Sequence, residues 1–195
     1  MFASSAKPVL PEPTLTELPN RQWYPVYTQP LREYRLAEWC LGHEVPFYLP
    51  LEKKFATKRV QRPAKVDIYK FEKFSPMFKG YLFAAMTTEE LTGIWHSNHV
   101  IRILRDAEQA QQRFLRELQV IRQFELASAE LPVKVLPELV NGARFVILDG
   151  PLQGIHGQLI ERRKQLLFAV NLDMFGQSVS AELDVSKYRL EPIDD

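Results

Sequence analysis

The amino-acid sequence predicts an α+β protein: an α/β sandwich built on a mostly antiparallel sheet, followed by a small all-β barrel. Three observations indicate this fold class. Before residue 127, aromatic and branched segments of strand length alternate with amphipathic helical patterns. Beyond residue 138 the helical period disappears, and five of the eight glycines fall among short strand-like segments. The 195 residues are 46% hydrophobic and 25% charged, which is ordinary for a chain with a buried core.

The domain organisation follows from the positions of the prolines and glycines. Four prolines precede Trp23 in a stretch with little periodic apolar pattern, so residues 1–22 are predicted to form an extended, mobile tail, in the simplest interpretation a non-specific leader. The first domain then covers 23–126. Pro132 and Pro137 bracket a linker at 127–137, and the second domain covers 138–195.

The first elements of the first domain are a strand and a helix. Residues 23–27 are aromatic and branched, which favours a strand, and Pro25 must face away from a ladder partner, at an edge or an irregularity. Pro30 suits the first turn of a helix that runs to Leu41, with Gly42 as its left-handed cap. The expected apolar face of this helix comprises Leu31, Tyr34, Ala37 and Leu41.

The remaining elements are expected in a fixed order. Strands are predicted at 45–49, 78–86 and 100–104, and Thr87 with Glu90 forms a capping box for a short helix that ends near His96. Asp106 and Gln109 resemble a second capping box, which opens a long helix. Strands of the second domain are predicted at 144–148, 155–161, 166–172 and 178–183. The apolar stripe of the long helix is Phe114, Leu115, Leu118, Ile121 and Phe124.

Charge is distributed unevenly along the chain. The formal net charge is +1, so any affinity for nucleic acid must come from local clusters. Between 52 and 65 six basic residues accompany one acidic residue, and this stretch is either a solvated loop or a surface that follows phosphates. Residues 138–195 carry a net charge of −3, which favours a protein partner for the second domain. The six basic residues are Lys53, Lys54, Lys58, Arg59, Arg62 and Lys65.

Several classes of protein are unsupported by the sequence. A single cysteine, Cys40, excludes an internal disulfide framework and suggests a buried, inert thiol. No apolar run approaches the roughly 18 residues of a membrane span, and the N-terminus lacks a signal-peptide core, which favours an intracellular protein. His96 and His99 make a poor metal site without a carboxylate or thiolate nearby. Without a catalytic motif, we expect a non-enzyme with neither cofactor nor metal.

Two passages, taken together, resemble the NusG family of transcription elongation factors. Trp23-Tyr24 opens a strand, Pro30 starts a helix, Leu49-Pro50 follows, and then comes Phe78-Lys79-Gly80-Tyr81-Leu82-Phe83, as in the N-terminal domain of that family. The segments 149–157, 171–176 and 179–183 look like a KOW domain, which is an SH3-like barrel. The glycines at 150, 154 and 157 are interpreted as structural residues of a tight hairpin and not as a phosphate cradle. The resemblance covers about residues 23–193.

The departures from the family pattern suggest a specialised member. Lys79 stands where the family has proline, Pro25 replaces a β-branched residue, and Leu152 replaces an aromatic residue. The resemblance therefore implies an RfaH-like paralogue that suppresses pausing and termination in particular operons. The alternatives are a general NusG factor that supports Rho-dependent termination, and a ribosome-associated KOW protein that binds RNA.

The resemblance also implies partners and the residues that contact them. The clamp helices of the largest RNA polymerase subunit would contact Phe78, Tyr81, Trp23 and Tyr24, for which the alternative is a place in the core. Upstream DNA would be contacted by Lys53, Lys54, Lys58, Arg59 and Arg62, and the non-template strand by His96, Asn98 and His99. A ribosomal small-subunit protein or Rho would bind Leu152, Ile155 and Phe175. We expect a monomer, free of membranes, in the bacterial cytoplasm and associated with the nucleoid through polymerase.

Overall fold

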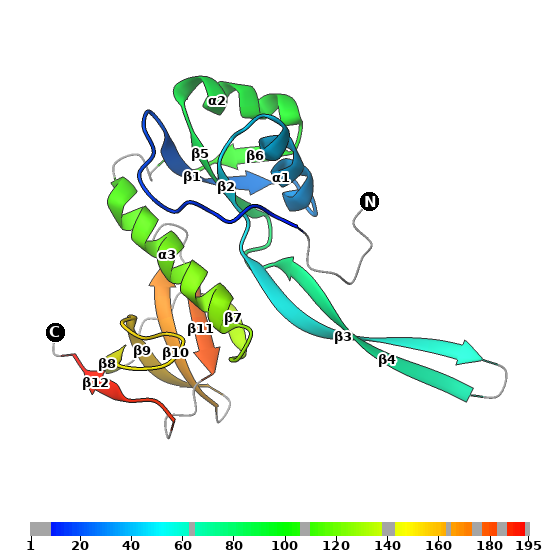
Figure 1. The fold of residues 1–195 in the computed structure, drawn as a ribbon, viewed down its shortest axis with the longest axis vertical. Coiled ribbons are helices and arrows are strands. Elements are labelled where there is room, and N and C mark those ends of the chain that lie inside the picture. Colours follow the sequence, from blue (N-terminus) through cyan, green and yellow to red (C-terminus); the bar gives the residue numbers. More distant parts are fainter. Residues whose placement is uncertain are drawn as a thin grey trace.

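The computed structural model describes residues 9–62, 65–105, 110–137, 143–162, 165–172, 177–182 and 187–193, and for the strand residues between 55 and 71 it describes the backbone. Figure 1 shows a sheet with two short helices, a protruding two-stranded ribbon, a long helix and a second group of strands. None of the described helices is long and apolar enough to cross a membrane.

The first sheet has four antiparallel strands in the order β2-β5-β1-β6. They are β1 (Gln22–Thr28), β2 (Phe47–Tyr48), β5 (Tyr81–Met86) and β6 (Val100–Ile103). The central strands β1 and β5 are buried along most of their length because both faces of the sheet are covered. The strand predicted at 78–86 begins three residues later, at Tyr81, because Gly80 forms a turn with a positive φ before it.

Strand β1 carries a proline, Pro25, although it pairs with a strand on each side. The Pro25 carbonyl accepts a hydrogen bond from Leu104 N (3.0 Å), at the end of the β6 pairing, so the missing N–H faces the place where that pairing stops. Two residues earlier, the side-chain amide of Gln111 pairs with the Trp23 backbone: Trp23 N donates to Oε1 (2.8 Å) and Nε2 donates to Trp23 O (2.9 Å). Pro25 thus faces the end of the β6 pairing, and the register irregularity of that pairing lies farther along, between Tyr27 and Thr28.

Helix α1 (Glu33–Gly42) buries only part of the predicted face: Ala37 is buried and Tyr34 packs partly buried against the core, but Leu31 and Leu41 do not. Its buried residues are Glu33, Leu36, Ala37 and Cys40, whereas Leu31 is 90% exposed before the helix starts and Leu41 is 58% exposed. The helix begins three residues after Pro30, so Leu31 lies in the loop before the helix and has no place on its face. Gly42 lies inside the helix, and His43 is its C-cap.

The next two elements follow the predicted capping chemistry. Helix α2 (Thr88–Gly93) starts at Thr87, whose side chain accepts from Glu90 N while the Glu90 carboxylate accepts from Thr87 N, so the capping box is confirmed. A short 3₁₀ helix, η1 (Ile94–Ser97), continues from it. The second proposed capping box, at Asp106 and Gln109, lies outside the described residues.

Residues 51–76 form a ribbon where the sequence suggested a charged loop. Strands β3 (Leu51–Arg62) and β4 (Lys65–Pro76) pair along 12 positions, a length of about 40 Å. The ribbon projects away from the rest of the molecule (Figure 1). Lysines and arginines stand at positions where a strand of a packed sheet would carry apolar residues, so the alternation typical of a strand was not visible in the sequence. Among the described residues, the two strands pair only with each other.

The described part of the N-terminal segment differs from the mobile tail that the sequence predicted. Residues 9–22 lie against helix α3 (Gln111–Ala127) and the sheet. The Leu15 carbonyl accepts from Gln119 Nε2 (3.0 Å), the Thr16 carbonyl accepts from Trp23 Nε1 (3.0 Å), and Glu12 forms an ion pair with Arg122. Backbone carbonyls that find donors on α3 and on β1 hold an extended segment in place without a regular element of its own.

The C-terminal residues form a six-stranded antiparallel sheet in the order β12-β8-β9-β10-β11-β7. Its strands β8 (Ala143–Ile147), β9 (His156–Arg162), β10 (Gln165–Leu172) and β11 (Gln177–Glu182) lie within two residues of the predicted ones. Strand β12 (Leu190–Pro192) was not predicted. Strand β7 (Val133–Pro137) falls in the predicted linker and pairs with β11, so the connector after α3 is shorter than expected.

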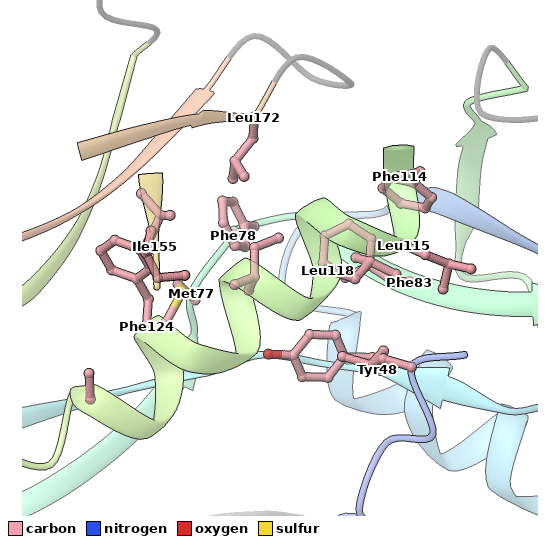
Figure 2. Packing of buried hydrophobic residues seen from close by; sticks show 14 of the residues in the cluster. Tyr48, Met77, Phe78, Phe83, Phe114, Leu115, Leu118, Phe124, Ile155 and Leu172 are labelled. Carbon is pink, nitrogen blue, oxygen red and sulfur yellow. The ribbon is translucent and has the colours of Figure 1, made fainter. Parts of the chain in front are cut away.

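Helix α3 joins the two parts through one hydrophobic cluster. The predicted stripe from Phe114 to Phe124 is buried, and the cluster that contains it also holds residues of the first sheet and of the C-terminal strands. Figure 2 shows Met77 and Phe78 beside Phe124 and Ile155 around this helix. The two predicted domains therefore share a core in this structure.

Candidate functional site

A pair of tyrosines, one exposed and one half-buried, marks the end of the first sheet. Tyr27 on β1 is opposite Tyr81 on β5, with ring centroids 5.2 Å apart at 49°, and Tyr27 is 37% exposed. The turn before β5 brings the rings together: Gly80 O accepts from Thr28 N (2.7 Å), and Gly80 N donates to the buried Glu33 carboxylate (2.7 Å). The turn that carries Tyr81 is therefore held by two hydrogen bonds at Gly80.

The predicted aromatic contacts divide into one surface residue and three core residues. Tyr81 is half-buried at the sheet end, whereas Phe78 and Trp23 are each 1% exposed and Tyr24 is 3% exposed. The Phe78 ring packs edge-on against Phe83 at 6.1 Å. In this packing Phe78, Trp23 and Tyr24 are core residues, which was the alternative to a polymerase contact in the sequence analysis.

A polar network fixes the root of the ribbon to α3. The Glu125 carboxylate accepts from the Tyr48 hydroxyl (2.9 Å), from Leu51 N (3.1 Å) and from Arg122 (2.7 Å). Burial, followed by the adjacent Glu125 charge, raises the pKa of Tyr48 well above its ordinary value, so the hydroxyl stays a proton donor. The direction in which the ribbon leaves the domain is set at these contacts.

The basic residues of the ribbon are in different electrostatic situations. Near the root, Lys53 forms an ion pair with Glu72 (2.5 Å), and Lys54 forms one with Glu52. Farther out, Lys58, Arg59 and Arg62 occupy backbone positions opposite Tyr69, Ile68 and Lys65 in the ladder. Residues 51–76 hold eight basic and three acidic residues, a net charge of +5, which distinguishes the ribbon from the nearly neutral chain.

The residues predicted to meet the non-template strand lie around the end of η1. His96 and Asn98 are exposed, and Asn98 has a left-handed backbone (φ +57°) as the C-cap of η1. His99 is half-buried, and its Nδ1 atom is buried without a hydrogen-bond partner among the described residues. The His99 carbonyl accepts from Gln29 N (2.8 Å), which brings the loop after β1 against this one.

A comparison with known protein families assigns the first part of the chain. The family model described as "Transcription termination factor nusG" matches residues 21–125, which include the four-stranded sheet, the ribbon and most of α3. The chain belongs to the NusG family. Members of this family act in transcription elongation and termination and bind RNA polymerase. No curated protein matches the chain.

The NusG match ends before the C-terminal sheet, so the KOW resemblance of that part stays a prediction. Of the residues assigned to its partner, Leu152 is 1% exposed and Ile155 is 5% exposed, both in the shared cluster, and Phe175 lies outside the described residues. The predicted structural role of the glycines fits the geometry. Gly150 and Gly154 have φ near +80°, and a Cβ at Gly157 would lie 2.6 Å from the Ala169 carbonyl oxygen.

Sequence reasoning missed two residues of the NusG-like surface. Tyr27 follows Trp23 by four residues in a strand, and the period of two already places Tyr27 on the same face as Trp23, which would have indicated an exposed continuation of the aromatic row. Leu31 was assigned to a helix face, and no signal in the sequence indicates its left-handed backbone (φ +61°).

Proposed function

We propose that this chain is an elongation factor that binds the clamp helices of RNA polymerase and suppresses pausing and termination. The observation that carries the proposal is the Tyr27–Tyr81 pair, with Tyr27 exposed and Tyr81 half-buried, on the sheet of a NusG-family domain. Rigid aromatic side chains that present their rings on a fixed backbone are typical anchors for a helical partner. By holding the clamp in one position, such a contact favours one state of the enzyme through differential binding.

The basic ribbon supports a second contact, with upstream DNA. Its 12-residue strands reach well beyond the domain, and its net charge of +5 gives it affinity for phosphates without sequence preference. A protein of this kind needs neither catalytic residues nor a cofactor, and we propose a monomeric, non-enzymatic factor that works in the cytoplasm wherever polymerase works.

The finer assignment is to an operon-specific antiterminator of the RfaH-like type. The departures at Lys79, Pro25 and Leu152 support it, as does the described part of the N-terminal segment, which packs against α3. A general factor that supports Rho-dependent termination is the second candidate. A ribosome-associated role is less well supported, because the C-terminal part carries a net charge of −3.

Substitution of the tyrosine pair tests the polymerase contact. Tyr27→Ala and Tyr81→Ala should each weaken binding to core polymerase by about 2 kcal/mol, because each removes an aromatic anchor from the contact. Binding is measured by fluorescence anisotropy, and single-round transcription reports pausing. Leu126→Ala, at an exposed leucine on the end of α3, is the control and should leave affinity unchanged. If both tyrosine variants stay folded by circular dichroism and bind as tightly as the parent, the proposed contact is wrong.

A further inference from the structure

The tyrosine pair belongs to a row of side chains that crosses three strands of the first sheet. Tyr27 on β1 is directly opposite Tyr81 on β5, and it is also directly opposite Arg102 on β6. Residues that face each other in an antiparallel ladder have their side chains on the same face of the sheet. Since neighbouring strands lie about 4.8 Å apart, the row spans about 10 Å, which is the width of one α-helix.

A second cation, Lys79, stands two residues before Tyr81. Lys79 is exposed and precedes Gly80 in the turn that leads into β5. Two features are typical of a type II turn: Tyr81 N donates to Phe78 O (3.1 Å), and φ of Gly80 is +80°. Type II turns favour proline at the position of Lys79. Because proline suits this backbone, the lysine points to a role outside the fold.

Neither of these cations has an acidic partner. Lys79 and Arg102 are both exposed, and among the residues that the structure describes neither side chain takes part in an ion pair or hydrogen bond. The carboxylate of Glu33 is buried below the turn, where it accepts from Gly80 N (2.7 Å). The segments that carry the row contain no Asp or Glu; they are residues 22–32, 77–86 and 98–105. The exposed charge at this end of the sheet is therefore positive.

We propose that this row binds an α-helix of RNA polymerase that carries carboxylates beside its apolar contact face, and that Arg102 and Lys79 pair with those carboxylates. The inference rests on the proposed function and names the chemistry of the partner at the same contact. The rings of Tyr27 and Tyr81 lie in contact, with centroids 5.2 Å apart, so no nucleic-acid base can insert between them. A guanidinium matches the two oxygens of a carboxylate, and charges at the rim of a contact steer the encounter and select the partner.

Association kinetics of the full chain with core polymerase, without nucleic acid, test the two cations. Arg102→Gln should lower kon about fivefold and reduce its salt dependence, because a steering charge is lost while the apolar contact stays in place. Lys79→Pro should lower kon about threefold while the melting temperature stays equal or rises, because proline suits the turn. Arg116→Gln, at an exposed arginine on α3, is the matched control and should associate like the parent.

Charge reversal tests whether the partner group is a carboxylate. Arg102→Glu should weaken binding to core polymerase about tenfold or more, because two like charges then meet at the contact. A polymerase with one acidic residue of the clamp helices replaced by lysine should restore the binding of this variant and bind the parent less tightly. If none of these lysine replacements restores binding, the assignment of a carboxylate partner is wrong.

Two further outcomes would overturn the inference. In the first, kon and its salt dependence are unchanged in both Arg102→Gln and Lys79→Pro. In the second, both variants bind polymerase normally and lose affinity for a 12-nucleotide DNA, so that the cations serve phosphates. If the inference fails while Tyr27→Ala still weakens polymerase binding, the elongation-factor proposal stands. If Tyr27→Ala also binds like the parent, the proposed polymerase contact fails with it.

Discussion

Gly80 shows at the residue scale why the aromatic motif contains a glycine. Its φ is +80°, and a Cβ at this position would lie 2.9 Å from the Tyr27 ring, so any other residue is strained and displaces the tyrosine pair. The replacement of the family's proline by Lys79 leaves this requirement untouched, because proline or lysine at 79 precedes the residue that needs the unusual backbone.

Gly80→Ala is therefore expected to lower the free energy of unfolding by about 1–2 kcal/mol, through the positive φ and the contact with Tyr27. Urea unfolding followed by circular dichroism measures the effect. Gly42→Ala provides a control of opposite sign, because nothing lies within 4 Å of a Cβ there and the residue is in a helix, so stability should rise by about 0.5–1 kcal/mol. Equal changes in both variants would show that Gly80 has no special role.

The structural role of a residue could be predicted from the sequence where its partners lie close by in the chain, and could not where they are distant. Thr87 and Glu90 satisfy each other's backbone within four residues, so their pattern was sufficient. Cys40 was predicted to be buried and inert; it is fully buried, and burial raises the pKa of its thiol to about 12, which keeps it protonated. The place of Leu31 depends on where α1 begins, and that is set by tertiary contacts such as Glu33 with Gly80, which span 47 positions.

At the scale of elements, Gln111 substitutes for a strand. Strand β6 does not reach Trp23, and the Gln111 amide pairs with the backbone N–H and C=O that β6 leaves open. Gln111→Leu should lower the free energy of unfolding by about 2 kcal/mol, because two backbone groups lose their partner. Gln112→Leu, at the next and exposed position of α3, should change stability by less than about 0.5 kcal/mol. Chemical denaturation distinguishes the two, and similar values for both would contradict this role.

The ribbon's outer charges belong to a separate prediction. Replacement of Lys58, Arg59, Arg62 and Lys65 by Gln should flatten the salt dependence of binding to a polymerase–nucleic-acid scaffold, by about 0.7–0.9 in log–log slope for each lost phosphate contact. Replacement of Lys53 and Lys54 is the control, since Glu72 and Glu52 already balance these charges. Affinity is measured at several salt concentrations, and an unchanged slope for the outer set would leave the ribbon without a role in DNA binding.

The elements that the sequence missed are those without a local signal. The ribbon pairs with no further strand among the described residues, and lysines and arginines interrupt the apolar alternation of its sequence, so residues 52–65 were interpreted as a charged stretch and not as a strand. The long helix was predicted because its apolar stripe repeats over three turns. Strand β7 has a suitable composition, but Pro132 and Pro137 at its ends suggested a linker, and only the pairing with β11 defines it.

At the scale of the whole molecule, one core joins two parts that the sequence treated as separate. Phe78, assigned to polymerase, and Ile155, assigned to the partner of the second domain, lie in the same buried cluster as Phe124 of α3 (Figure 2). Sequence patterns describe faces of single elements, and they do not show that two such faces cover each other. In this arrangement Phe78 is withdrawn from solvent, whereas Tyr27 is exposed and Tyr81 is half-buried.

This arrangement leads to a prediction for the full chain. Ile155→Asp places a charge in the shared cluster, which weakens the contact between the two parts because a buried carboxylate without a partner is costly. If polymerase also uses Phe78, the closed arrangement reduces apparent affinity by the fraction of molecules that are open, and the variant should bind polymerase severalfold more tightly. Small-angle scattering should show a larger radius of gyration, and circular dichroism should retain the strand signal.

Leu148→Asp, at an exposed residue of the same part, is the control. An expanded variant with unchanged affinity would show that Phe78 is a core residue in the bound state as well, and that Tyr27 and Tyr81 act without it.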